Sequence, residues 1–188
     1  MRDLKQRDGM AARALEFLIL TAARSGEVRG ARWSEVDVGT ATWTVPAERM
    51  KAGREHRVPL SPRAMELLQA LPTFEGTDLI FPGVRGGPLS DMSLSAVTRR
   101  MKVDAVPHGF RSSFRDWAAD STAYAREVAE AALAHTIPDE VEAAYRRSDL
   151  FGKRRKLMAE WAAFLDRAPA EIAAVVPLEP ARKARSRA

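Results

Sequence analysis

The sequence contains no cysteine, and among its 188 residues there are only three histidines and two tyrosines. Without cysteine the chain can form neither disulfide bonds nor metal sites with thiolate ligands. No apolar run approaches the roughly 20 residues that a transmembrane helix needs. The first ten residues, MRDLKQRDGM, are polar and charged and lack the apolar core of a signal peptide. These absences predict a cytoplasmic protein without a membrane partner.

Apolar and basic residues, in contrast, are plentiful. Hydrophobic residues make up 46% of the sequence, which at this length is sufficient for one domain with a substantial core. Lys and Arg number 30 against 25 Asp and Glu, giving a formal net charge of +5. This balance favours a polyanionic partner such as nucleic acid, although many other proteins share it. Charge alone therefore does not decide the function.

The beginning of the chain is predicted to contain a linker end and two helices. Residues 1–8 are charged, show no apolar pattern and are typical of the end of a linker. Residues 9–23 carry apolar side chains at helical spacing. Ser25 then has the character of an N-cap for a short second helix. The folded domain is therefore expected to begin near residue 9.

A small antiparallel sheet is predicted after these helices. Apolar and polar residues alternate near residues 43–45 and again near residues 58–60, as they do in half-buried strands. The polar segment between them contains Gly53, which suits the loop of a hairpin. Residues 36–38 could supply a third strand. We interpret His56 as a strand residue that can touch phosphate rather than as a metal ligand.

The remainder of the chain is predicted to be mainly helical, so the expected fold class is α+β with a small three-stranded antiparallel sheet. Ser61 and Ser90 are expected N-caps, and Asp149 is expected to cap the last helix. The apolar residues 79–81, within a Pro- and Gly-rich loop, should fill the core. Three further helical segments respectively begin at His108, end at His135 and contain Tyr145.

Six polar side chains have the chemistry that cleavage of a phosphodiester requires. The reaction needs a nucleophile, positive charge for the non-bridging oxygens and an acid for the leaving 5′ oxygen. A tyrosine can attack phosphorus, and its phenolate can also leave again, so a phosphotyrosine bond is reversible without ATP. Arginine matches two phosphate oxygens, whereas histidine and lysine can transfer protons. The residues of these types are Arg24, Lys51, His108, Arg111, His135 and Tyr145.

Each of these residues also has an ordinary structural explanation. Arg24 and Glu27, three residues apart, could form a surface ion pair, and Lys51 in a hairpin loop could be solvated. The spacing of His108 and Arg111 places them on one face of a helix, where His108 could simply cap it. The combination and order of the residues, rather than any one of them, favours a catalytic site.

Four segments in order resemble the motifs of the tyrosine recombinases, which are the phage-type integrases. The segments are TAARSGEVRGARWSEVD, ERMKAGREHRVPLS, HGFRSSFRDWA and ALAH followed by EAAYRRSD. The resemblance is strongest to integrases of prophages and genomic islands. It implies a tyrosine recombinase catalytic-domain fold over residues 9–167, encoded by a bacterium or a phage. It also implies site-specific DNA recombination that integrates or excises a mobile element, without a metal or another cofactor.

The resemblance assigns roles to the first part of the site. Arg24 matches the first catalytic arginine of the family, and Glu27 matches the acidic residue that supports it. Lys51 matches the hairpin lysine that protonates the leaving 5′ oxygen. The implied partner is double-stranded DNA at attachment sites, bound by a homotetramer, whereas an isolated catalytic domain is expected to be a monomer.

The resemblance assigns the remaining roles to the second half of the chain. His108 and Arg111 match the family's His-x-x-Arg box, and His135 matches its second histidine. Tyr145 matches the nucleophile that becomes joined to a DNA 3′ phosphate, because the other tyrosine, Tyr124, lies outside the motif.

The basic segment 168–188, which ends in ARKARSRA, has few large apolar residues. We expect it to be flexible or to dock on a partner. Nothing in the sequence resembles the N-terminal domains with which full-length integrases clamp the core site and bind arm sites. The chain by itself should therefore bind DNA weakly and recombine poorly.

Three other functions remain open at this point. A type IB topoisomerase shares much of this chemistry but relaxes DNA without exchanging partners. A non-catalytic relative could keep the fold and bind DNA only. A metal-dependent hydrolase could use His56, His108 and His135, although their spacing fits no ligand motif.

Overall fold

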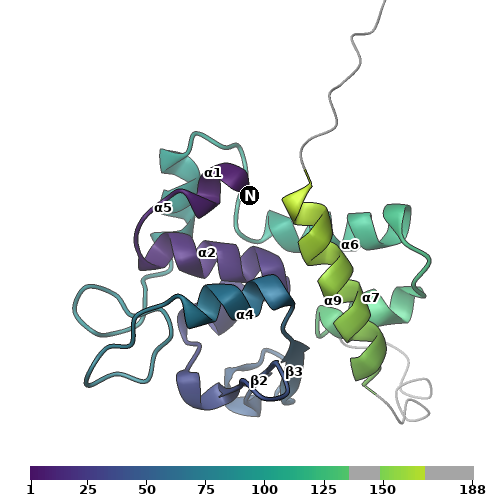
Figure 1. Cartoon of the computed structure of the whole chain (residues 1–188), viewed down its shortest axis with the longest axis horizontal. Coiled ribbons are helices and arrows are strands. Elements are labelled where there is room, and N and C mark those ends of the chain that lie inside the picture. The colour runs from purple at the N-terminus through teal and green to yellow at the C-terminus, as the bar shows by residue number, and fades with distance from the viewer. Residues whose placement is uncertain (136–148, 168–188) are drawn as a thin grey trace, which may run out of the picture.

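The computed structural model describes residues 1–135 and 149–167. Figure 1 shows α1, α2, α4 and α5 on one side of the molecule and α6, α7 and α9 on the other, with the sheet at one end. The described elements are α1 (Arg2–Lys5), α2 (Met10–Thr21), α3 (Ser25–Arg29), η1 (Trp33–Glu35), β1 (Val36–Asp37), β2 (Thr42–Val45), η2 (Ala47–Arg49), β3 (His56–Pro59), α4 (Pro62–Gln69), α5 (Ser93–Arg100), α6 (Gly109–Ser121), α7 (Arg126–Ala132) and α9 (Phe151–Asp166). The predicted mainly helical α+β class is confirmed. None of the helices described is both long and apolar enough to cross a membrane.

Helix α2 forms the centre of the core because apolar side chains leave it in several directions. Phe17 and Leu18 are fully buried, and the helix contacts α1, α3, α4, α5 and α9. The Phe17 ring lies 5.2 Å from the Trp43 ring of the sheet and 5.5 Å from the Phe81 ring, measured between centroids. Residues 79–81 are all buried, which confirms that this loop fills the core.

A second cluster of aromatic rings holds α6 against α9. Trp161 lies 5.0 Å from Trp117 and 5.4 Å from Phe114 between ring centroids, and the Phe164 ring lies 5.6 Å from both tryptophans. The indole N–H of Trp161 also donates a hydrogen bond of 2.8 Å to the carbonyl oxygen of Ile19 in α2. The last helix is therefore fixed both to α6 and to the central helix.

The three strands form one antiparallel sheet in the order β1-β2-β3, as predicted. Trp43 pairs with Val58 and Val45 pairs with His56, so the buried sides of β2 and β3 coincide. The loop between these strands contains Gly53 with a φ of 61°, a conformation that glycine adopts without steric cost. This hairpin carries the predicted lysine.

Residues 2–5 form a helix where the sequence predicts a linker end without pattern. Leu4 of this helix is 3% exposed and joins the core. Arg13 stabilises the end of α1 because its guanidinium donates hydrogen bonds to the carbonyl oxygens of Leu4, Lys5 and Arg7 at 2.9 to 3.1 Å. These contacts join residues up to nine positions apart, so local periodicity could not reveal them.

The helix starts agree with the sequence in part. Ser61 caps α4 as predicted, because its hydroxyl accepts a hydrogen bond from a backbone N–H of the first turn. Ser90 does not cap α5 as predicted, because the helix begins at Ser93 with Met92 as its N-cap, and the Ser90 hydroxyl lies 2.9 Å from the Ser93 hydroxyl. Ser25 is the first residue of α3 rather than its N-cap, a position that Arg24 occupies.

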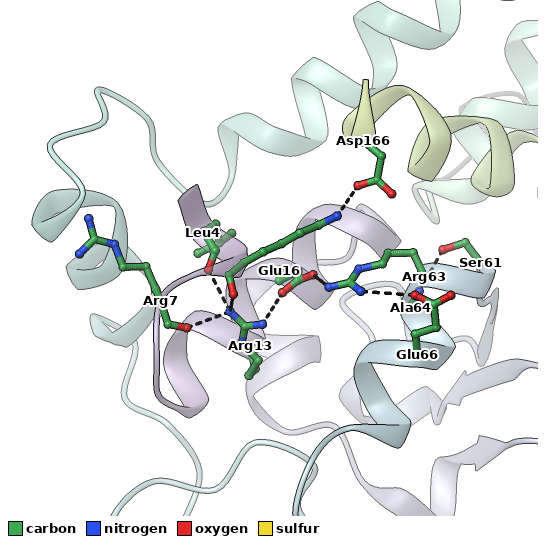
Figure 2. A network of polar contacts seen from close by, with 10 residues as sticks. Leu4, Arg7, Arg13, Glu16, Ser61, Arg63, Ala64, Glu66 and Asp166 are labelled. Atoms are coloured by element: carbon green, nitrogen blue, oxygen red, sulfur yellow. Dashed lines mark hydrogen bonds and ion pairs between the residues drawn. The ribbon is translucent and has the colours of Figure 1, made fainter. Parts of the chain in front are cut away.

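A buried carboxylate links α2 to α4. Glu16 is fully buried, and its two oxygens contact Arg13 and Arg63, each at 2.8 Å. Figure 2 shows Arg13, Glu16, Arg63 and Glu66 as a continuous chain of contacts. The hydrogen bond to Glu16 raises the pKa of Arg63 above its usual value. Two guanidinium groups thus compensate the burial of one charge, which would otherwise be costly.

Candidate active site

Arg24 and Glu27 form a braced pair at the junction of α2 and α3. Ala22 ends α2 in the left-handed conformation, with a φ of 50°, and turns the chain so that Arg24 becomes the N-cap of α3. Glu27 accepts hydrogen bonds of 2.8 Å from both the backbone N–H and the guanidinium Nη1 of Arg24. Glu27 is only 4% exposed. The predicted contact between Arg24 and Glu27 is present, and the supporting role of Glu27 stays a prediction.

Arg111 joins the end of α2 to the turn after α7. Its side chain is 5% exposed and donates hydrogen bonds to the carbonyl oxygen of Ala22 and, at 2.7 Å, to that of Leu133. Burial, together with the charge of Arg24, lowers the pKa of Arg111 to about 10, although Glu27 partly opposes this. Arg111 therefore remains charged at neutral pH. Because the two charges act on each other, the guanidinium groups share one electrostatic environment.

His135 lies beside Arg111 and is oriented by a carboxylate. The distance from His135 Nε2 to Arg111 Nη2 is 3.5 Å, and His135 Nδ1 lies 2.5 Å from Glu130 Oε2. Burial alone would raise the pKa of Glu130, but its contacts with His135 and Arg115 outweigh burial and lower it. An ionised Glu130 accepts a hydrogen bond from the Nδ1–H of His135, which leaves Nε2 directed toward Arg111. We call Arg24, Arg111 and His135 the polar cluster.

His108 lies at the start of the same helix as Arg111. It is the N-cap residue of α6, and its backbone carbonyl accepts a hydrogen bond of 3.1 Å from the Arg111 N–H. The His108 side chain is exposed. Phe110, the neighbour of Arg111 in α6, is only partly buried, whereas Arg111 is buried more deeply. The buried face of α6 thus directs the Arg111 guanidinium toward the end of α2 and the turn after α7.

Lys51 lies in the exposed part of the hairpin loop, as predicted, and both sides of that loop are attached to neighbours of the polar cluster. On one side, the guanidinium of Arg49 donates to the carbonyl oxygen of Glu27. On the other side, His56 Nε2 lies 3.3 Å from the carbonyl oxygen of Ala132, at the end of α7. The loop that carries Lys51 is therefore held between α3 and α7.

Tyr145 lies outside the described residues. The other tyrosine, Tyr124, donates a hydrogen bond of 2.7 Å from its hydroxyl to Glu160. This hydrogen bond, together with burial and the negative charge of Glu160, raises the pKa of Tyr124 to about 12. A hydroxyl that holds its proton so firmly is a poor nucleophile at neutral pH.

Arg154 fixes the chain shortly after the segment that contains Tyr145. It is 2% exposed and donates hydrogen bonds to the carbonyl oxygen and the carboxylate of Asp149, at 2.8 and 2.9 Å. A third hydrogen bond, of 2.7 Å, reaches the carbonyl oxygen of Arg57 in β3. Asp149 also accepts a hydrogen bond of 3.1 Å from the Phe151 N–H, but the N-cap of α9 is Leu150 and not Asp149 as predicted.

Two contributors to this region, Glu130 and Arg154, are absent from the sequence-based set of site residues. Glu130 could have been found, because it lies five residues before His135 on the helix that leads to it. Arg154 gives no such signal, since it stands among the basic residues of KRRK and has the appearance of a solvated charge. Its burial depends on the packing of α9 against the sheet.

Solved structures of DNA integrases share the described fold. The integrase from mycobacterium phage Brujita superposes with a TM-score of 0.66 at 20% identity, covering 87% of this chain and 56% of that one. Lambda integrase, solved as a tetramer bound to a Holliday junction, gives 0.53 at 22% identity over 72% of this chain and 43% of its own. These likenesses place the fold in the class of tyrosine recombinase catalytic domains.

Sequence comparison identifies the family. A sequence model described as the phage integrase family matches residues 3–150. The chain therefore belongs to the phage integrase family, as its motifs predict. Prophage integrase IntA of Escherichia coli K12 is 38% identical, covering 77% of this chain and 36% of that protein. The integrase of Enterobacteria phage P4 is 34% identical over 81% and 39%. The chain spans about two fifths of the length of the curated relatives it matches.

Proposed function

We propose that this chain is the strand-exchange domain of a site-specific recombinase that cleaves and rejoins DNA through Tyr145. The observation that supports this most strongly is the reach of Arg111, which bonds the end of α2 near Arg24 and lies beside His135. Two guanidinium groups and an imidazole thereby converge from three distant parts of the chain. Such a cluster can embrace the non-bridging oxygens of one phosphodiester.

In the proposed cleavage step the hydroxyl oxygen of Tyr145 bonds to phosphorus while the bond from phosphorus to the 5′ oxygen breaks. The protein becomes joined to the 3′ phosphate, and the other strand end leaves with a 5′ hydroxyl. Nε2 of His135 receives the phenol proton, because Nδ1 is directed to Glu130. Lys51 supplies the proton to the departing oxygen. In the reverse direction a 5′ hydroxyl attacks the phosphotyrosine, so the strands rejoin without another energy source.

The arginines and His108 are proposed to act on the phosphate itself. Negative charge builds on the non-bridging oxygens as the new bond forms, and fixed positive groups stabilise it without having to reorganise. Arg111 is suited to this because hydrogen bonds from its guanidinium to two backbone carbonyls hold it in place. Glu27 holds Arg24 in the same way. His108, which is exposed at the start of α6, is proposed to donate a hydrogen bond to the same phosphate.

The identity of the nucleophile is supported by the state of the other tyrosine. The sequence has two tyrosines, and the hydroxyl of Tyr124 is bound to Glu160 with its pKa raised to about 12. These properties make Tyr124 a poor nucleophile, and we assign the nucleophile to Tyr145 from its place in the family motif.

We further propose that the partner is double-stranded DNA at attachment sites and that strand exchange takes place in a homotetramer. Lambda integrase, which shares the fold, has been solved as a tetramer bound to a Holliday junction and as a dimer bound to a COC′ core site. The excess of basic residues in this chain suits such a partner, with 30 Lys and Arg against 25 Asp and Glu.

A trapping experiment tests the proposed function. The protein is incubated at high concentration with a pool of duplexes that carry a nick within randomised sequence, so that the short strand released by cleavage diffuses away. Wild type and Tyr124→Phe should form a protein–DNA adduct that survives denaturation, whereas Tyr145→Phe should form none. Binding without an adduct would identify a non-catalytic relative. Relaxation of supercoiled DNA without recombinants, in a full-length protein, would favour a type IB topoisomerase.

A further inference from the structure

We propose that His56 is a positioning residue for Lys51, holding the lysine hairpin against the turn that binds Arg111. This inference rests on the proposed function, since it concerns the acid of the cleavage step. It assigns no contact with the substrate to His56 and gives it a structural task within the catalytic cycle.

The first observation is the place of His56 in the hairpin. It is the first residue of β3, pairs with Val45 of β2 and follows Lys51 by five residues. Its side chain is half-buried, whereas residues 51–55 before it are exposed. His56 is therefore the first residue after the lysine loop that packs against the rest of the protein.

The second observation is the partner of its imidazole. His56 Nε2 lies 3.3 Å from the carbonyl oxygen of Ala132, 76 residues away in the sequence. Ala132 is the last residue of α7, and the next residue, Leu133, supplies the carbonyl that accepts a hydrogen bond from Arg111. His135 follows two residues later. One short turn thus receives the hairpin through His56 and the phosphate-binding arginine through Leu133, which couples the positions of the two.

The charges around His56 keep the imidazole neutral. Burial, with the nearby charge of Arg154 and a smaller effect of Arg111, lowers the pKa of His56 to about 4 against the opposing charge of Glu27. At neutral pH the ring therefore carries one proton, and in the tautomer with this proton on Nε2 it donates to the Ala132 carbonyl. A neutral imidazole of this kind is suited to a hydrogen bond and is a poor acid for the leaving oxygen.

The opposite side of the loop has a comparable attachment. Arg49 donates to the carbonyl oxygen of Glu27 and to the carboxylate of Glu35. Arg49 thus fixes the loop to the side of the site that carries Arg24, whereas His56 fixes it to the side that carries Arg111. Removing the imidazole of His56 takes away the attachment of the loop to the turn that binds Arg111, although the carbonyl of Arg57 still accepts from Arg154. The Lys51 ammonium should then lose its position while the polar cluster stays intact.

The test separates positioning of the acid from other defects by changing the leaving group. In a nicked duplex recovered from the pool, the bridging 5′ oxygen at the cleavage site is replaced by sulfur. A thiol is far more acidic than an alcohol, so the sulfur leaves as a thiolate that needs no proton. Any variant whose defect lies in the acid should regain its rate on the sulfur substrate. A variant that fails to stabilise the phosphate should remain slow on both substrates.

We expect His56→Leu to form adduct roughly 10- to 100-fold more slowly than wild type on the oxygen substrate, as displacement of a catalytic group by about 1 Å can do. On the sulfur substrate its rate should lie within about twofold of wild type. Lys51→Ala should show the same pattern more strongly, and Arg111→Ala should be slow on both. DNA affinity should stay unchanged in His56→Leu.

His56→Gln is the matched control, because its amide nitrogen can reach the place of Nε2 and donate the same hydrogen bond, and it should restore the oxygen rate. His56→Asn has a shorter side chain and should behave like His56→Leu. If His56→Leu does not fold, the rates of His56→Gln and His56→Asn can be compared instead. A wild-type rate in His56→Leu and His56→Asn, or an equal loss on both substrates, would overturn the inference alone. Absence of adduct from wild type on either substrate would overturn the proposed function with it.

Discussion

Lowering the pH from 7 to 5 should destabilise the wild-type protein more than it destabilises His56→Gln. The imidazole of His56 is half-buried and bonded to the Ala132 carbonyl, and burial with the charge of Arg154 lowers its pKa to about 4. In the unfolded chain the same imidazole has the ordinary pKa of about 6.5. At a pH between these two pKa values, the imidazole is mostly protonated in the unfolded state and mostly neutral in the folded state. Stability from His56 is therefore complete above pH 6.5 and is lost progressively as the pH falls toward 4.

The magnitude follows from the difference between the two pKa values. Each pKa unit corresponds to about 1.4 kcal/mol, so at pH 5 the difference in proton binding amounts to about 2 kcal/mol of unfolding free energy. Because part of the His56 ring remains in contact with solvent, screening reduces this value, and a loss of about 1 to 2 kcal/mol is expected. Glutamine does not titrate and keeps a donor for the carbonyl, so His56→Gln should lack this loss.

The assay is urea unfolding of both proteins at pH 7 and pH 5 at constant ionic strength. Carboxylates that titrate in this range contribute to both proteins, so the difference between the two pH-induced changes isolates His56. We expect a larger pH-induced loss of unfolding free energy in wild type, by about 1 to 2 kcal/mol. Equal losses in the two proteins would show that the imidazole is not held neutral and would refute the argument.

Three further predictions concern catalysis and binding. Arg24→Ala and Arg111→Ala should each slow adduct formation on the nicked duplex by about 10²- to 10³-fold, because each removes one contact to the developing charge; a wild-type rate in either would refute its role. Glu130→Ala should slow the same step by roughly tenfold, since Nδ1 of His135 loses its hydrogen-bond acceptor. An unchanged rate would show that the contact between His135 and Glu130 does not contribute to catalysis. DNA affinity, measured by fluorescence anisotropy, should fall steeply with salt, and a flat response would make the basic balance incidental.

The sheet and most helix positions could be predicted because their signals are local. Trp43 and Val45 alternate with threonines, and Gly53 marks the loop between two such runs, so the hairpin depends on neighbours in sequence. Helix α1 could not be predicted in this way. It has four residues and one buried apolar side chain, Leu4, and its end is held by Arg13 from α2.

The same distinction applies to the site. The brace between Arg24 and Glu27 follows from a spacing of three residues, and the structure contains it. The contact between Arg111 and His135 joins residues 24 positions apart and depends on how α6 packs against α7. Arg154 shows most clearly what the sequence cannot predict. It stands in a run of basic residues, yet it is buried and donates three hydrogen bonds to Asp149 and Arg57.

Locating the covalent bond tests the central claim most directly. Trypsin cleaves after Arg126 and Arg146, so the two tyrosines fall in separate peptides, Tyr124 in DWAADSTAYAR and Tyr145 in EVAEAALAHTIPDEVEAAYR. The trapped adduct is digested with nuclease and trypsin, and tandem mass spectrometry then assigns the residue that keeps the nucleotide. We expect a 3′-phosphoryl nucleotide on Tyr145. Attachment to Tyr124 or to any other side chain, or DNA cleavage without a covalent intermediate, would contradict it.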